Sequence, residues 1–123
     1  MPGMKAERRK NYKSGVDAEA HAAQTLACNG YTILNRRYKT PAGEIDLVVS
    51  RGDELGFVEV KKRRSLEEAA WSITERQQRR IIDAASYWMQ NFPDQGAQSI
   101  TFDAVFVCPG QPPEHVVDAF RLF

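Results

Sequence analysis

Two stretches of the chain repeat their apolar residues at the spacing of an α-helix. The first begins at Ser14, which suits an N-cap, and ends at Asn29-Gly30, where glycine suits the left-handed residue that closes a helix. The second begins at Thr74, with Gln77 at the third helical position as a capping box, and runs to Phe92. The pattern therefore predicts two helices separated by a long non-helical region.

Five other stretches are short, rich in β-branched and aromatic residues, and bounded by turn formers, so they are predicted to be strands. In chain order they cover residues 31–38, 43–49, 57–62, 100–108 and 115–120. Most of them carry apolar residues on both faces, which is typical of strands covered on both sides. The order helix, three strands, helix, two strands predicts an α/β fold, a three-layer sandwich in which helices flank a mixed central sheet.

Composition fits one domain. The 123 residues are 42% hydrophobic and 27% charged, which is ordinary for a globular protein. We expect a mobile basic arm over residues 1–13 and a single domain over residues 14–123. No apolar run approaches membrane-spanning length and no secretory signal is recognisable, so we expect a cytoplasmic protein. Cys28 and Cys108 lack the spacing of zinc ligands and are interpreted as small buried apolar residues.

Charge is unevenly distributed, although the formal net charge is only +1. The positive excess lies in the first third of the chain, and further basic clusters occur at residues 61–64 and at Arg76, Arg79 and Arg80. Basic clusters around a carboxylate site suit a polyanionic substrate. The near-neutral total is equally consistent with basic side chains that only solvate helices and loops.

The predicted hairpin of residues 43–62 places carboxylates in strands that also carry apolar residues on both faces. Because side chains alternate along a strand, Asp46 should share a face with Glu44 and Val48, and Glu59 should share one with Lys61. A register that brings Asp46 opposite or diagonal to Glu59 would separate the carboxylates by roughly 5–8 Å. A hard divalent cation would relieve their repulsion. The alternative is a solvated strand face whose ion pairs contribute little.

Asp46, followed on the next strand by Glu59-Val60-Lys61, resembles the signature of PD-(D/E)XK nucleases. The longer string of residues 43–47 with residues 57–63 resembles the YraN-type family of uncharacterised bacterial proteins, which is similar to archaeal Holliday junction resolvases. The likeness covers residues 15–120. The PD-(D/E)XK core has the order α-β-β-β-α-β, so the resemblance implies the restriction-endonuclease-like fold that the predicted elements also fit.

The resemblance implies a metal-dependent endonuclease that acts on DNA, including branched or otherwise structured DNA. Asp46 and Glu59 would ligate Mg²⁺ or Mn²⁺, Glu19 in the first helix would complete or orient the ligand shell, and Lys61 would position water or stabilise the phosphate. Gln77 would hydrogen-bond the water or a phosphate. The side chains expected to hold the DNA backbone without reading bases are Arg36, Arg37, Lys62, Arg63 and Arg64.

Three positions depart from the family pattern: Arg37 replaces a common asparagine, Gln77 a lysine, and Thr101 an arginine. The loss of two basic residues supports an alternative, a nucleic-acid-binding protein on a nuclease fold with little or no hydrolysis. Glu19 equally suits an exposed glutamate near a helix N-terminus, and Gln77 equally suits a pure capping role. Resolvase relatives are commonly dimers, so a homodimer is also open, although no apolar stripe in the sequence marks a dimer surface.

Overall fold

The computed structural model of the chain describes residues 17–65, 67–68, 73–95, 97 and 99–120. The predicted basic arm of residues 1–13 and the predicted N-cap Ser14 lie outside these ranges. Among the described elements, no helix has the length and apolar character that crossing a bilayer requires.

The elements follow the predicted order. A helix over residues 17–28 comes first. The later elements are β1 (Thr32–Thr40), β2 (Gly43–Arg51), β3 (Glu54–Lys62), α3 (Glu75–Asn91), the 3₁₀ helix η1 (Pro93–Gln95), β4 (Ser99–Val107) and β5 (Glu114–Val116). The last strand is shorter than predicted, because residues 117–118 turn the chain and Asp118 has a φ of 56°.

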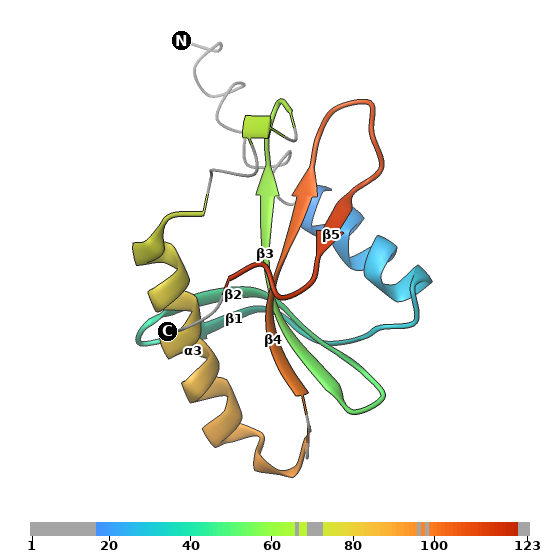
Figure 1. Ribbon diagram of the computed structural model, residues 1–123. Helices are drawn as coiled ribbons and strands as arrows, with labels where there is room; N and C mark the ends of the chain where they lie inside the picture. The colour runs from blue at the N-terminus through green and yellow to red at the C-terminus, as the bar shows by residue number, and fades with distance from the viewer. Residues whose placement is uncertain (1–16, 66, 69–72, 96, 98, 121–123) are drawn as a thin grey trace, which may run out of the picture.

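The strands form one sheet in the order β1-β2-β3-β4-β5. β3 and β4 are parallel, whereas the other neighbours are antiparallel, so the sheet is mixed as predicted. A parallel pair needs a crossover connection, and α3 lies in that connection between β3 and β4. The helix of residues 17–28 and α3 lie on opposite sides of the sheet, which makes the three-layer α/β sandwich (Figure 1).

One layer of core separates the sheet from α3. The buried side chains that pack together there are Ile45, Val48, Leu55 and Phe57 of the strands and Ile81, Ala84, Ala85 and Trp88 of the helix. The indole N–H of Trp88 donates to the Asn35 side chain at 2.7 Å, so the one polar atom of this large residue is satisfied.

The other layer of core lies under the first helix. Ala22, Ala23 and Leu26 pack against the strand residues Leu47, Val49, Val58 and Val105. Two of the three helix residues are alanines, and small side chains let the helix backbone lie close to the sheet. This close packing holds the start of the described helix, including Glu19, against the sheet. Cys28, at the end of this helix, is exposed, so the prediction that both cysteines are buried is confirmed for Cys108 and wrong for Cys28.

Three predicted helix ends fall on described residues and all are confirmed, since α3 ends with Phe92 as its C-cap and the other two ends show the expected caps. The Thr74 side chain accepts from the Gln77 N–H, and the Gln77 side chain accepts from the Thr74 N–H, which is the expected capping box. At the end of the first helix, Gly30 has a φ of 90° and donates to the Ala27 carbonyl, while Tyr31 donates to the Leu26 carbonyl. These two bonds form a Schellman motif.

Candidate active site

Asp46 lies where the regular pairing of β2 is interrupted. Its neighbours Ile45 and Leu47 both pair with residues of β1, whereas the pairing passes over Asp46 itself. The pairing of β2 with β3 starts at Leu47, and its register, continued by one residue, brings Asp46 opposite Glu59. The predicted juxtaposition of these two carboxylates is therefore present.

The interruption also changes which way the side chains of β2 point. Glu44 and Asp46 line a cavity on the side of the first helix, as their predicted common face requires. Val48, which was predicted to share that face, instead packs against α3 together with Ile45. Strict alternation would put Ile45 and Val48 on opposite faces, so the prediction for Val48 was wrong because it assumed an unbroken strand.

The Asp46 carboxylate is held between the two strands of the hairpin. One of its oxygens accepts from the Val60 N–H at 2.8 Å and so replaces a backbone partner for that group. The pKa of Asp46 is raised to about 7, chiefly by burial and then by the charge of Glu59 and a hydrogen bond between the two carboxyl groups, while the Val60 N–H opposes the rise. Asp46 therefore changes its protonation state near neutral pH.

Glu59 and Lys61 share a face of β3, as predicted, and form an ion pair. The Lys61 ammonium lies 3.1 Å from a Glu59 oxygen, and each side chain is only about one-sixth exposed. Together with the Asp46 contact, this places two carboxylates and one amine at the same end of the hairpin. The constellation predicted from the D…ExK pattern is thus brought together.

Glu19 reaches the site from the first helix. The residue is only 7% exposed, so the alternative of an exposed helix glutamate is excluded. Arg37 Nε lies 2.8 Å from one Glu19 oxygen, and Arg36 Nε lies 3.5 Å from the other. The negative charge of Glu19 contributes to the raised pKa of Asp46. Glu19 therefore belongs to the same electrostatic cluster, and its charge is compensated by two arginines.

A cavity of about 180 Å³ opens beside Asp46 and Glu19, and Glu59 and Lys61 are not part of its lining. Its lining residues are Ala18, Glu19, Arg37, Glu44, Asp46, Val60 and Lys62. Within the part of the chain that the structure describes, no three His, Cys, Asp or Glu side chains are grouped closely enough to hold a metal ion as they stand. The oxygen donors Asp46 and Glu59 suit Mg²⁺ or Mn²⁺ as a pair, while Glu19 is turned toward its arginines.

The remaining residues singled out from the sequence lie in three places. Lys62 lines the cavity, and Arg63 and Arg64 follow it in the loop after β3, where Arg64 lies 3.6 Å from Glu68. The Gln77 side chain is engaged in the capping box and lines a different hollow at the start of α3. Sequence reasoning placed Arg36 and Arg37 on a DNA backbone and missed their contact with Glu19, because no spacing in the sequence signals that a helix and β1 meet there.

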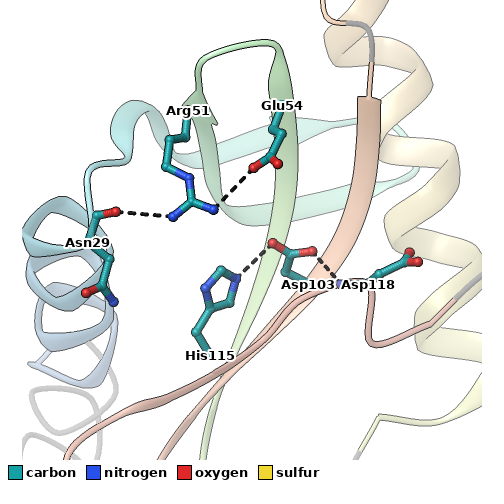
Figure 2. A network of polar contacts seen from close by, with 6 residues as sticks. All are labelled: Asn29, Arg51, Glu54, Asp103, His115 and Asp118. Carbon is teal, nitrogen blue, oxygen red and sulfur yellow. Dashed lines mark hydrogen bonds and ion pairs between the residues drawn. The ribbon is translucent and has the colours of Figure 1, made fainter.

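A second polar cluster lies apart from the cavity. Asp103 is 1% exposed; its Oδ2 is 2.8 Å from His115 Nε2, and its Oδ1 accepts from the Asp118 N–H at 2.9 Å. Figure 2 shows these contacts beside Arg51, which bonds the Asn29 carbonyl and the Glu54 carboxylate. Asp103 joins β4 to β5 and the turn after it, which is a structural role.

Comparison with known proteins gives a consistent result. The model of the uncharacterised protein family UPF0102 matches residues 18–107. A UPF0102 protein of Bradyrhizobium sp. strain BTAi1 is 46% identical over 114 residues, which cover 93% of this chain and 84% of that protein. A UPF0102 protein of Rhodopseudomonas palustris strain HaA2 is 48% identical over 109 residues, which cover 89% of this chain and 85% of that protein. The chain belongs to UPF0102, the YraN-type family that its hairpin sequence resembles.

Proposed function

We propose that this protein is a metal-dependent endonuclease that hydrolyses phosphodiester bonds in DNA, including branched or otherwise structured DNA. The observation that carries the proposal is the contact between the partly buried carboxylates of Asp46 and Glu59, in which burial and mutual repulsion raise the pKa of Asp46 to about 7. Two acids placed side by side in a covered hairpin destabilise the fold unless a proton or a cation joins them. A carboxylate pair that prefers a cation is what a hydrolytic metal site needs.

The side chains divide the work between holding the ion and handling the substrate. Asp46 and Glu59 would hold Mg²⁺ or Mn²⁺, and Glu19 would join them or orient the shell. The bound ion would supply a Lewis acid for the phosphate and lower the pKa of the attacking water. Lys61, already beside Glu59, would donate to a phosphate oxygen or orient that water. The water oxygen adds to phosphorus, one P–O bond to sugar breaks, and the departing oxygen takes up a proton.

The cations around the cavity would hold the DNA backbone. Arg37 and Lys62 line the cavity itself, and Arg36, Arg63 and Arg64 lie on the adjoining strand and loop. Such contacts go to phosphates and position the substrate without reading its sequence. A protein with this substrate would work in the cytoplasm, where bacterial DNA lies. A homodimer is a further prediction of the resolvase likeness, which sedimentation would test.

A second function, DNA binding with little or no hydrolysis, is favoured by a specific observation. Glu19 is occupied by Arg37 and Arg36, and the amide oxygen of Gln77 is occupied by the Thr74 N–H. Two of the five residues expected to perform catalysis are thus engaged elsewhere in this conformation. A fold that kept its basic surface but never released these two side chains would bind DNA without cutting it.

Cleavage assays separate the two functions. Linear duplex, single-stranded and four-way-junction DNA are incubated with the protein and Mg²⁺, Mn²⁺ or EDTA. We expect metal-dependent nicking that Asp46→Asn, Glu59→Gln and Lys61→Met each reduce at least about a hundredfold. Glu54→Gln, at the far end of the same hairpin, serves as the control and should cut at the wild-type rate. Binding without cleavage under every metal would overturn the enzyme and leave the second function.

A further inference from the structure

A second hollow lies at the start of α3. Its volume is about 630 Å³, and its lining residues are Ala42, Thr74, Arg76, Gln77, Arg79, Arg80 and Asp83. We call it the arginine hollow. Positions 76, 79, 80 and 83 follow one another at helical spacing, so their side chains emerge from one face of the helix.

The arginine hollow is positively charged and its cations are available. Asp83 is the one carboxylate in the lining, against three arginines. Arg79 lies 3.8 Å from Glu75, but these two side chains are 75% and 85% exposed, so the pair is weak. Among the residues that the structure describes, neither Arg76 nor Arg80 has an ion-pair partner. The hollow therefore suits an anion.

The arginine side chains are the groups that would bind an anion in this hollow. The Gln77 N–H already donates to the Thr74 hydroxyl, and the Gln77 amide oxygen already accepts from the Thr74 N–H. These bonds occupy the Gln77 N–H and the Gln77 amide oxygen. Any anion in the hollow would meet guanidinium groups, whose planar donors match phosphate oxygens.

The turn between β1 and β2 separates the arginine hollow, on the side of α3, from the cavity lined by Glu19, Glu44 and Asp46, called here the carboxylate cavity, on the side of the first helix. Ala42 lines the hollow and Glu44 lines the cavity, and two residues span at most about 7 Å. Gly43 lies between them, and the Cγ and Cδ atoms of Arg80 lie 2.8 Å from the position that a Cβ on Gly43 would occupy. The missing side chain lets Arg80 lie directly against the turn that separates the arginine hollow from the carboxylate cavity.

We propose that the arginine hollow binds a second stretch of the phosphodiester backbone of the same nucleic acid whose scissile phosphate enters the carboxylate cavity. This inference rests on the proposed function. A single small anion would gain little from exposed arginines in salt solution. A polyanion that crosses the turn at Gly43 would contact both places at once, and linked contacts reinforce each other. The hollow thereby favours strands long enough to extend past the cavity.

The test separates binding from cleavage. Binding of a four-way DNA junction and of a matched duplex is measured by fluorescence anisotropy in EDTA, at several salt concentrations, for the wild type and for Arg76→Gln/Arg80→Gln. The control Gln90→Glu/Gln95→Glu changes the net charge by the same amount. Gln90 lies on the same helix, about 15 Å or more along its axis from both arginines. Cleavage by Asp46→Asn is measured in parallel.

We expect Arg76→Gln/Arg80→Gln to bind DNA on the order of tenfold more weakly than the wild type at 0.1 M salt. The slope of log K against log salt is negative, and its magnitude should fall by about 2. The charge-matched control should keep the wild-type slope. If the arginine variant keeps the wild-type slope while Asp46→Asn loses cleavage, the proposal that the arginine hollow binds DNA is wrong and the proposed nuclease activity stands. If the magnitude of the slope falls in the arginine variant but the wild type cleaves no DNA, DNA binding by the arginine hollow is supported and the proposed nuclease activity is wrong. Absence of DNA binding by the wild type would overturn both.

Discussion

Asp46 combines three features that are costly in isolation. It interrupts the pairing of its own strand, it is largely buried, and it faces another carboxylate. The Val60 N–H partly compensates its negative charge, and protonation near neutral pH removes that charge. A residue needed only for folding would be replaced with gain by asparagine, which offers the same acceptor without charge. A gain in the free energy of unfolding when asparagine replaces Asp46 would therefore indicate that the carboxylate serves a role other than folding.

Asp46→Asn is expected to stabilise the metal-free protein, and more so at high pH. Because the folded state raises the pKa of Asp46 from 3.8 to about 7, the folded state holds the proton more tightly than the unfolded state between these values. The wild type thus loses stability as pH rises from about 4 to 7, whereas the uncharged variant does not. We expect the variant to gain about 1–3 kcal/mol at pH 8 and less at pH 5.

Urea unfolding in EDTA at both pH values measures this difference. Glu67→Gln changes an exposed acid at a helical position after β3; it is the control and should change neither value by more than about 0.5 kcal/mol. Equal stability of Asp46→Asn and the wild type at pH 8 would mean that Asp46 is already neutralised by a group other than its proton.

At the scale of elements, local chemistry determined the ends that the sequence predicted. Thr74 with Gln77 and Asn29-Gly30 were recognised because a cap needs particular side chains within one turn, and both caps are present. The interruption at Asp46 could not be predicted in the same way, since it depends on how β1 and β3 meet β2. Nor could the contact of Glu19 with Arg37, which joins residues 18 positions apart on different layers.

The capping box provides a test of the two roles considered for Gln77. Thr74→Ala removes the acceptor for the Gln77 N–H and should lower the free energy of unfolding by about 1 kcal/mol, whereas Thr74→Ser should restore most of it. Gln77→Ala removes the reciprocal bond and should lower stability by a similar or smaller amount. Cleavage rates of both variants are then compared at a temperature where each is folded.

The comparison distinguishes a cap from a catalyst. If Gln77 only closes the helix, Gln77→Ala and Thr74→Ala should cut DNA at similar rates. A rate for Gln77→Ala at least tenfold below that of Thr74→Ala would show that the amide also meets the water or a phosphate. Because the observed bonds already satisfy the amide oxygen, we expect similar rates.

At the scale of the molecule, the sheet gathers charges of both signs at one end of the hairpin. Asp46, Glu59 and Glu19 bring negative charge close to the cations that would hold a polyanion. The sequence alone predicted Asp46 and Glu59, because isolated acids in apolar strands are informative, whereas the role of Glu19 was implied by the family resemblance. The balance of positive and negative charge could not be predicted, because it depends on the fold. Arg36 and Arg37, which the sequence assigned to the DNA backbone, instead pair with Glu19.

This balance predicts that the metal-free protein binds a DNA backbone more weakly than variants that lack one of the two carboxylates. In EDTA at pH 8, Asp46 and Glu59 add negative charge where a phosphate must enter, so Asp46→Asn and Glu59→Gln should each bind a four-way junction about three- to tenfold more tightly than the wild type. Ca²⁺, a hard oxygen-binding cation, should tighten binding by the wild type and have little effect on the variants. Fluorescence anisotropy with and without Ca²⁺ measures both effects, and Glu54→Gln, distant on the same hairpin, controls for the change in net charge. Variants that bind no more tightly than the wild type in EDTA would separate the carboxylate pair from the DNA path.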